Sequence, residues 1–144
     1  MLFRFRQQHL HHIPRSNRLE GAIDPALEIT SLETLNLSRN SFNGSIAYSI
    51  GSMKLLQRLN LASNQLTGEL PESVGELTSL KELVLSLNHC GGSIPSSLSR
   101  CMQLEIVDFA DNDFSGELPA GVYLLSNLRR LSLAYNGLQG FPLL

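Results

Sequence analysis

The stretch LQRLNLASNQLTGELPESVGELTS, residues 56–79, decides the fold of this chain. In it Leu56, Leu59 and Leu61 precede Asn64, and Gly68 follows four residues later. The same pattern recurs because asparagines stand at 24-residue intervals, at Asn40, Asn64, Asn88, Asn112 and Asn136. Leucine supplies 29 of the 144 residues, or 20%. Self-similarity at a fixed period of this length indicates a repeat architecture.

The alternation around Leu59 and Leu61 predicts a short strand with one buried face. The other units carry equivalent pairs at Leu35/Leu37, Leu83/Leu85, Val107/Phe109 and Leu131/Leu133. The asparagine that follows each strand has a side-chain amide that both donates and accepts hydrogen bonds. We therefore predict a buried asparagine ladder between stacked coils. One unit cannot bury its apolar face alone, but a stack of units can.

The order Leu-x-x-Leu-x-Leu-x-x-Asn is the leucine-rich repeat signature. The 24-residue period with Gly-x-Leu-Pro, as in Gly68–Pro71, resembles the plant-specific extracellular subclass over roughly residues 17–140. The resemblance implies an α/β-type repeat solenoid of about five 24-residue repeats. It also implies a right-handed superhelix with a concave parallel β-sheet and an irregular or 3-10 convex side.

The expected domain organisation is a basic, irregular segment at 1–16 and a leucine-rich repeat domain at 17–144. After a partial first coil, repeats begin near residues 32, 56, 80, 104 and 128. No apolar segment follows Met1–Arg6, so no signal peptide is expected, and no run approaches the roughly 18 apolar residues of a membrane span. The family's paired-cysteine caps are absent, so a fragment or truncated member of a longer ectodomain is expected.

No enzyme motif is present, and we expect neither catalysis nor a cofactor. A net charge of −2 argues against nucleic acid as a partner. The histidines at 9, 11 and 12 lack further ligands at suitable spacing, so no metal site is expected. Cys90 and Cys101 fall in apolar columns of the repeat, which favours two buried thiols over a disulfide.

The concave face of repeats three to five is the candidate binding surface, whereas the early repeats are polar there. Strand alternation is expected to turn apolar side chains outward next to acidic ones. The candidate partner-binding residues are Val84, Leu87, Ile106, Asp108, Asp111 and Tyr135. Exposed apolar groups on neighbouring strands, rimmed by charge, are typical of recognition patches. The alternative is that they are merely residues with a high strand propensity.

Two sequons, Asn36-Leu37-Ser38 and Asn43-Gly44-Ser45, are candidate glycosylation sites, with unmodified asparagines as the alternative. The leading hypothesis is a protein- or peptide-binding module resembling part of a receptor-like kinase or receptor-like protein ectodomain. A co-receptor is a further expected partner, and the resemblance implies a location outside the cell. The alternatives are a secreted inhibitor or scaffold of the polygalacturonase-inhibitor kind and a truncated, non-functional gene product.

Overall fold

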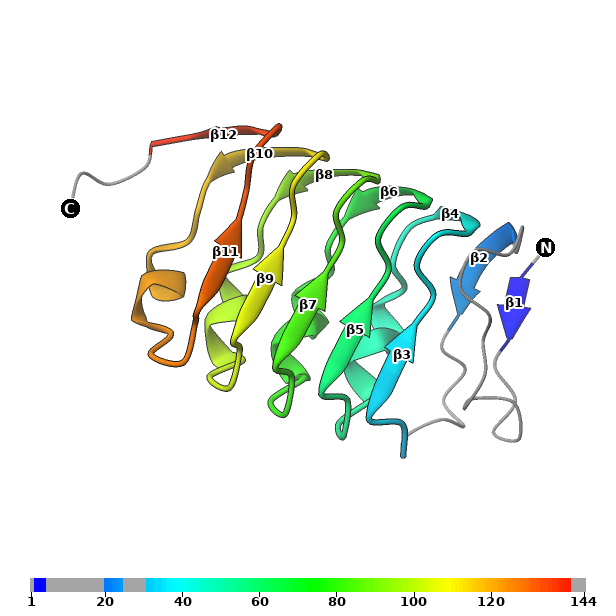
Figure 1. Ribbon diagram of the computed structural model, residues 1–144, viewed down its shortest axis with the longest axis horizontal. Coiled ribbons are helices and arrows are strands. Elements are labelled where there is room, and N and C mark those ends of the chain that lie inside the picture. The colour runs from blue at the N-terminus through cyan, green and yellow to red at the C-terminus, as the bar shows by residue number, and fades with distance from the viewer. Residues whose placement is uncertain (1, 5–19, 25–30, 141–144) are drawn as a thin grey trace.

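The computed structural model describes residues 2–4, 20–24 and 31–140 as a solenoid of stacked coils. Within residues 31–140, one side of each coil contributes a three-residue strand to a five-stranded parallel sheet (Figure 1). Its strands follow the chain in order: β3 (Thr34–Asn36), β5 (Arg58–Asn60), β7 (Glu82–Val84), β9 (Ile106–Asp108) and β11 (Arg130–Ser132). We call this sheet the concave sheet.

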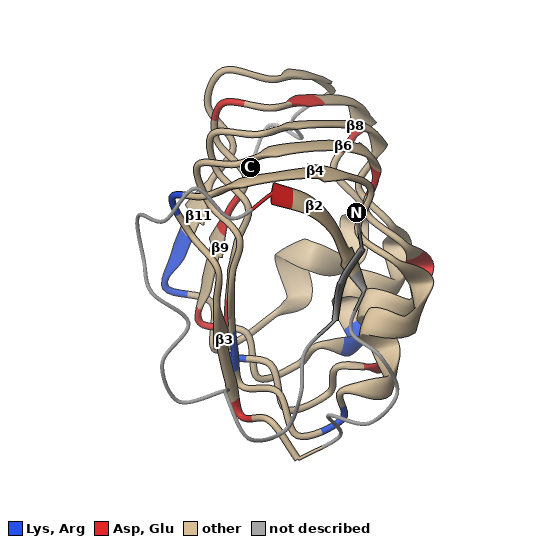
Figure 2. Cartoon of the chain, turned by 90° about the vertical axis from the view of Figure 1, so that its right-hand side faces the viewer, with Lys and Arg blue, Asp and Glu red and all other residues tan. Residues whose placement is uncertain are grey.

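A second parallel sheet runs along the adjacent side of the solenoid, and 3-10 helices form the third side, as the view along the coils shows (Figure 2). The strands of the second sheet are β1 (Leu2–Arg4), β2 (Glu20–Asp24), β4 (Ser41–Gly44), β6 (Gln65–Glu69), β8 (His89–Ser93), β10 (Asp113–Glu117) and β12 (Gly137–Gln139). The helices are η2 (Tyr48–Ser52), η3 (Glu72–Glu76), η4 (Ser96–Arg100) and η5 (Ala120–Leu124). The predicted solenoid, with its concave parallel sheet and 3-10 side, is confirmed.

The two sheets differ in register. Leu59 pairs with Leu83 in the concave sheet, a separation of 24 residues that equals the sequence period. Phe114 pairs with Gly92 in the second sheet, a separation of 22 residues. The two-residue offset is even, so the same repeat columns stay on the inner face of β4, β6, β8 and β10.

The core fills the space between the three sides. Leucines of the repeat columns are buried in coil after coil, together with the fully buried rings of Phe42, Phe109 and Phe114. The rings of Phe109 and Phe114 lie 5.2 Å apart between centroids and are tilted by 33°. The core side chains of the last described coil are less buried. Leu131 is 37% exposed there, whereas its counterpart Leu83 is fully buried.

The N-terminal segment differs from expectation in one respect. Residues 1–16 were expected to be irregular, yet β1 pairs in parallel with β2 along Leu2–Arg4. The reason is that the edge of β2 presents unpaired N–H and C=O groups, on which an extended segment can add a strand. The expectations for His9, His11, His12 and the partial first coil fall largely on residues outside those described.

No helix in the described part of the chain is long and apolar enough to cross a membrane.

Candidate functional site

The asparagines at 64, 88, 112 and 136 each link their own coil to the preceding one. Asn88 Nδ2 donates to the carbonyls of Leu61, 2.9 Å away, and Leu85, 3.0 Å away. Its Oδ1 accepts the N–H of Leu66 at 3.0 Å. One buried amide thus satisfies three backbone groups that the turn leaves unpaired.

The same bonds recur at the other coils. Asn64, Asn112 and Asn136 each donate to a carbonyl 27 residues earlier and accept an N–H 22 residues earlier. Asn40 donates to the carbonyls of Leu37 and Ser38 in its own coil. The five predicted ladder asparagines therefore occupy equivalent places in the repeat, and the bonds of Asn64, Asn88, Asn112 and Asn136 to the preceding coil hold the coils in register.

The residue just before each ladder asparagine has a left-handed backbone. The φ angles of this column run from 56° to 59° at Arg39, Ser63, Leu87, Asp111 and Tyr135, and we call these residues the ridge. The expectation that strand alternation turns ridge side chains outward is wrong, because β7 ends at Val84, before the ridge residue Leu87. The chain turns sharply here so that the next side chain, the ladder asparagine, points inward. Side chains of the ridge point outward as a consequence of this turn and not of strand alternation.

A hollow of about 430 Å³ lies beside the ridge of coils three to five, and we call it the ridge hollow. Three predicted binding residues line it: Leu87, Asp111 and Tyr135. Leu87 is 54% exposed and Tyr135 is 81% exposed. The other lining residues are Asn88, His89, Asn112 and Asp113, none of which is among the six predicted binding residues. Their position in the sequence could have pointed to them, since His89 and Asp113 directly follow ladder asparagines.

The other three predicted binding residues lie on the concave sheet outside that hollow. Val84 and Asp108 are register partners on β7 and β9, and Ile106 begins β9. All three are half-buried. Asp108 is held in place, because its Oδ1 accepts the N–H of Ala110 at 3.2 Å and its Oδ2 lies 3.7 Å from Arg130 Nη2. The structure thus divides the six predicted residues into two adjoining groups.

The first coils carry a different surface. A polar hollow of about 340 Å³ is lined by Asn36, Ser38, Arg39, Asn60, Ala62 and Ser63. Asn36 Oδ1 accepts two hydrogen bonds from Ser38, one from its backbone N–H at 3.1 Å and one from its hydroxyl at 2.7 Å. This sequon asparagine therefore also stabilises a turn. Asn43, the other sequon asparagine, is exposed on β4. Glycosylation of either residue stays a prediction.

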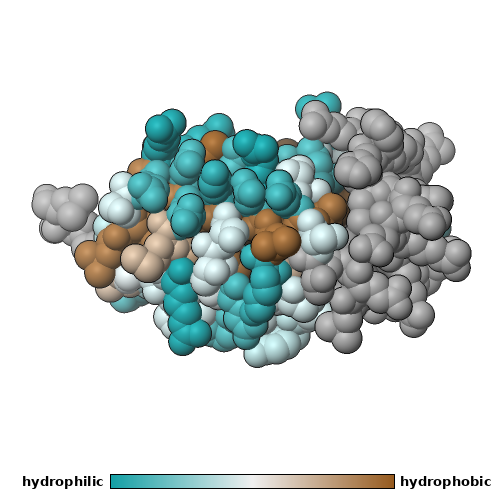
Figure 3. All heavy atoms as spheres, turned by 90° about the horizontal axis from the view of Figure 1, so that it is seen from below, coloured by the Kyte–Doolittle hydropathy of each residue, from teal (hydrophilic) through white to brown (hydrophobic). Residues whose placement is uncertain are grey.

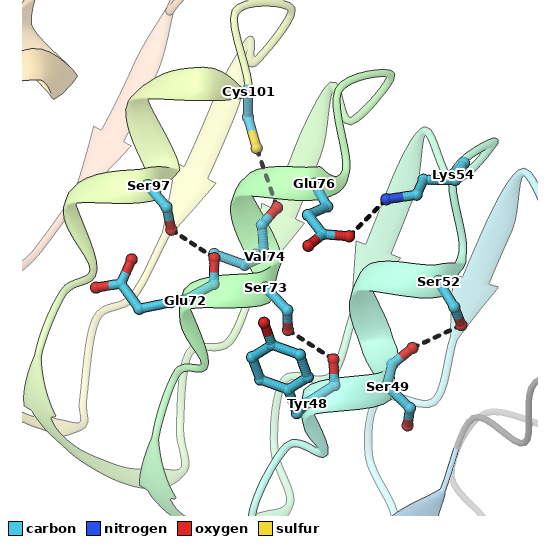
Figure 4. Close-up of polar contacts among 10 residues, drawn as sticks. All are labelled: Tyr48, Ser49, Ser52, Lys54, Glu72, Ser73, Val74, Glu76, Ser97 and Cys101. Carbon is cyan, nitrogen blue, oxygen red and sulfur yellow. Dashed lines mark hydrogen bonds and ion pairs between the residues drawn. The ribbon is translucent and has the colours of Figure 1, made fainter.

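The convex side holds a serine column that the sequence analysis missed, although Ser49, Ser73 and Ser97 recur at the repeat period. Ser73 Oγ donates to the carbonyl of Tyr48 at 2.6 Å, and Ser97 Oγ donates to that of Glu72 at 2.7 Å (Figure 4). These bonds join successive 3-10 helices, as the asparagine ladder joins the turns on the opposite side.

An ion pair lies on the same convex side of the solenoid. Lys54 Nζ lies 2.6 Å from Glu76 Oε2, and this hydrogen bond, with the attraction between the charges, lowers the pKa of Glu76 (Figure 4).

The edge of the solenoid seen from below is mostly polar, with separate apolar areas (Figure 3). Met102 and Leu124 are 70% and 82% exposed, and they line a third hollow of about 250 Å³ at the ends of η4 and η5.

The two cysteines are free and buried, which confirms the prediction from their columns. Burial raises the pKa of each thiol to about 11, so neither is a reactive thiolate near neutral pH. Within residues 2–4, 20–24 and 31–140, no three His, Cys, Asp or Glu side chains are grouped so as to hold a metal ion.

The family model described as Leucine Rich Repeat matches residues 31–53, 55–77 and 79–101. The leucine-rich repeat ectodomain of the receptor kinase SOBIR1 from Arabidopsis thaliana is 32% identical, with a TM-score of 0.81. The match covers 86% of this chain and 68% of that one. The chain belongs to the leucine-rich repeat family.

Two further relatives of this leucine-rich repeat chain are plant receptors. Phytosulfokine receptor 1 of Arabidopsis thaliana is 40% identical over 60 residues, which are 41% of this chain and 6% of the receptor. The Arabidopsis receptor kinase HAESA, solved in complex with the peptide hormone IDA and the co-receptor SERK1, is 38% identical with a TM-score of 0.80. That match covers 88% of this chain and 21% of the HAESA chain, so our sequence spans a small part of either receptor.

Proposed function

We propose that this leucine-rich repeat chain is a non-catalytic module that binds a protein or peptide. The binding surface comprises the concave sheet at β7 and β9 together with the adjoining ridge. Its residues are Val84, Leu87, Ile106, Asp108, Asp111 and Tyr135. The observation that carries the proposal is the exposure of two large apolar side chains there, Leu87 and Tyr135, which lie two coils apart and beside carboxylates. Surfaces of this composition supply anchors and orienting charges to a partner.

The backbone of the ridge strengthens this interpretation. A left-handed conformation costs a residue with a Cβ roughly 1–2 kcal/mol, and glycine or asparagine adopts it more easily. Leu87 and Tyr135 occupy it although their exposed side chains add little to the core. An unfavourable conformation combined with exposure makes sense if these side chains act outside the fold.

The relatives support the class of partner. HAESA is described with a peptide hormone and a co-receptor, and we extend both kinds of partner to this chain as part of the proposal. A location outside the cell or at the plasma-membrane surface belongs to the same proposal, since the related chains are receptor ectodomains.

A selection of random peptides displayed on phage, panned against the immobilised chain, tests the function. We expect enriched peptides whose affinity falls at least about tenfold in Ile106→Glu, because an unpaired charge is costly at the centre of an interface. The matched control is Gln103→Glu, which adds the same charge at an exposed position outside the proposed surface. Thermal melts of both variants separate lost binding from lost folding. Failure to enrich any peptide, or equal binding by both folded variants, would overturn the proposal.

A further inference from the structure

We infer that the ridge hollow accepts an arginine side chain of the partner. This inference rests on the proposed function and names the chemistry of one contact within it.

The walls of the hollow are apolar and belong to alternate coils. Leu87 and Tyr135 occupy the same column two coils apart, with Asp111 between them. Strand spacing of about 4.8 Å per coil separates the two walls by roughly 9–10 Å. That gap admits one long, thin side chain lying against both walls.

The hollow is acidic as well as apolar. Asp111 and Asp113 are exposed and line it, and no lysine or arginine does. Three ion pairs form within the described residues, Lys54–Glu76, Arg58–Glu82 and Arg130–Asp108, and none involves these two carboxylates. The other titratable side chains lining the hollow are those of His89 and Tyr135, and the tyrosine carries no charge as a phenol. The lining therefore has a formal charge of −2 when His89 is neutral.

Arginine fits this combination better than other side chains. Its aliphatic stem can cover Leu87, and its guanidinium can stack on the face of an exposed tyrosine ring such as Tyr135. The planar group also presents paired N–H donors to a carboxylate, whereas lysine offers a compact and strongly hydrated charge. An acidic or purely apolar side chain would leave either the carboxylates or the walls unmatched.

The test is an NMR titration of the uniformly ¹⁵N-labelled chain with N-acetyl-arginine methylamide, up to about 50 mM because a single side chain binds weakly. The matched probe is the citrulline analogue, which has nearly the same shape without the charge. We expect saturable shifts at residues 87–89, 111–113 and 135 with the arginine compound, and shifts at least about fivefold smaller with citrulline.

Two double variants with the same change of charge complete the experiment. Asp111→Asn/Asp113→Asn should weaken the arginine response at least about fivefold, since it removes both carboxylates of the hollow. Glu69→Gln/Glu117→Gln, on exposed positions of the second sheet, should change it less than about twofold. An equal response to citrulline, equal effects of the two double variants, or no saturable shift would each overturn the inference. Peptides sensitive to Ile106→Glu would still support the proposed function in that case, so the two failures are distinguishable.

Discussion

The polar hollow of the first coils and the ridge hollow of the later coils are built on the same backbone. Both include residues of the left-handed ridge, Arg39 and Ser63 in one and Leu87, Asp111 and Tyr135 in the other. The first hollow extends to concave-strand residues before the ridge, Asn36 and Asn60, whereas the second extends to residues after it, His89 and Asp113. Their ridge side chains also differ, since they are guanidinium and hydroxyl in the first hollow and apolar and acidic in the second. The difference teaches that the repeat builds the scaffold while the outward columns, which the scaffold does not constrain, carry specificity.

The asparagine ladder should matter equally in the two regions. Asn64→Leu and Asn88→Leu each remove a buried amide that donates to carbonyls of two successive coils and accepts one backbone N–H. Each should therefore lower the free energy of unfolding by about 1–3 kcal/mol. Urea unfolding followed by circular dichroism measures both. The exposed Asn43→Leu serves as a control that should stay near the parent. A loss confined to one region would mean that the coils do not share one scaffold.

Close packing of the 3-10 helices should be uniform as well. A Cβ added at Gly51 would lie 2.7 Å from the Ser73 carbonyl oxygen, and one at Gly75 would lie 2.5 Å from that of Ser97. We expect Gly51→Ala and Gly75→Ala each to destabilise the chain by about 2 kcal/mol, because backbone must shift.

The matched control for the glycines is Gly91→Ala, whose added Cβ meets its nearest neighbour at an ordinary 3.5 Å. Thermal melts should show little change for this variant. If all three variants melt alike, the helices adapt more easily than their contacts indicate.

A substitution in the ridge should change stability and binding in opposite directions. Leu87→Asn places a residue that tolerates the left-handed backbone at a φ of 59°, so we expect a gain of about 0.5–1 kcal/mol in unfolding free energy. The same variant should weaken the binding of selected peptides, because it removes an apolar anchor. His89→Asn, a neighbouring exposed residue outside the positive-φ set, should bring no such gain.

Improved stability with unchanged binding in Leu87→Asn would remove the ridge from the proposed surface. No gain in stability would mean that the surrounding turn relieves the strain of leucine there.

The smallest expected effect concerns pH. The Lys54 contact lowers the pKa of Glu76 in the folded chain, so the stabilisation is fully present above the ordinary value of 4.5. It is lost as the pH falls through the lower folded value, because protonation then breaks the pair. Lys54→Gln should flatten the decline of the melting temperature slightly below pH 4.5, since both groups are exposed. A matched decline in parent and variant would show that the pair adds nothing.

The core and the ladder were readable from the sequence because they follow the 24-residue period. Leu59, Leu83 and Val107 lie buried in one column, and Asn64, Asn88 and Asn112 lie buried in another. Ser73 and Ser97 also recur at the 24-residue period, but the sequence alone did not indicate that their hydroxyls donate hydrogen bonds to the preceding helix. Small polar residues are common at helix surfaces, so their recurrence was a weak signal.

The candidate site was only partly readable. Val84 and Ile106 lie on the concave strands as alternation predicts. Leu87 and Tyr135 do not, because the chain leaves the strand and turns left-handed before them. His89 and Asp113 join them in the ridge hollow for the same reason.

The sequence by itself determined the repeat, its inward columns and the family, because burial of a periodic apolar face leaves few alternatives. The tertiary structure alone decided which outward side chains share a surface. Residues 24 positions apart become neighbours only when coils stack, and the side on which a ridge residue emerges depends on a turn that carries no glycine to signal it. The hydrogen bonds of Asn88 and Asn112 to neighbouring coils stabilise the chain in that turn, and such bonds exist only when the coils are stacked.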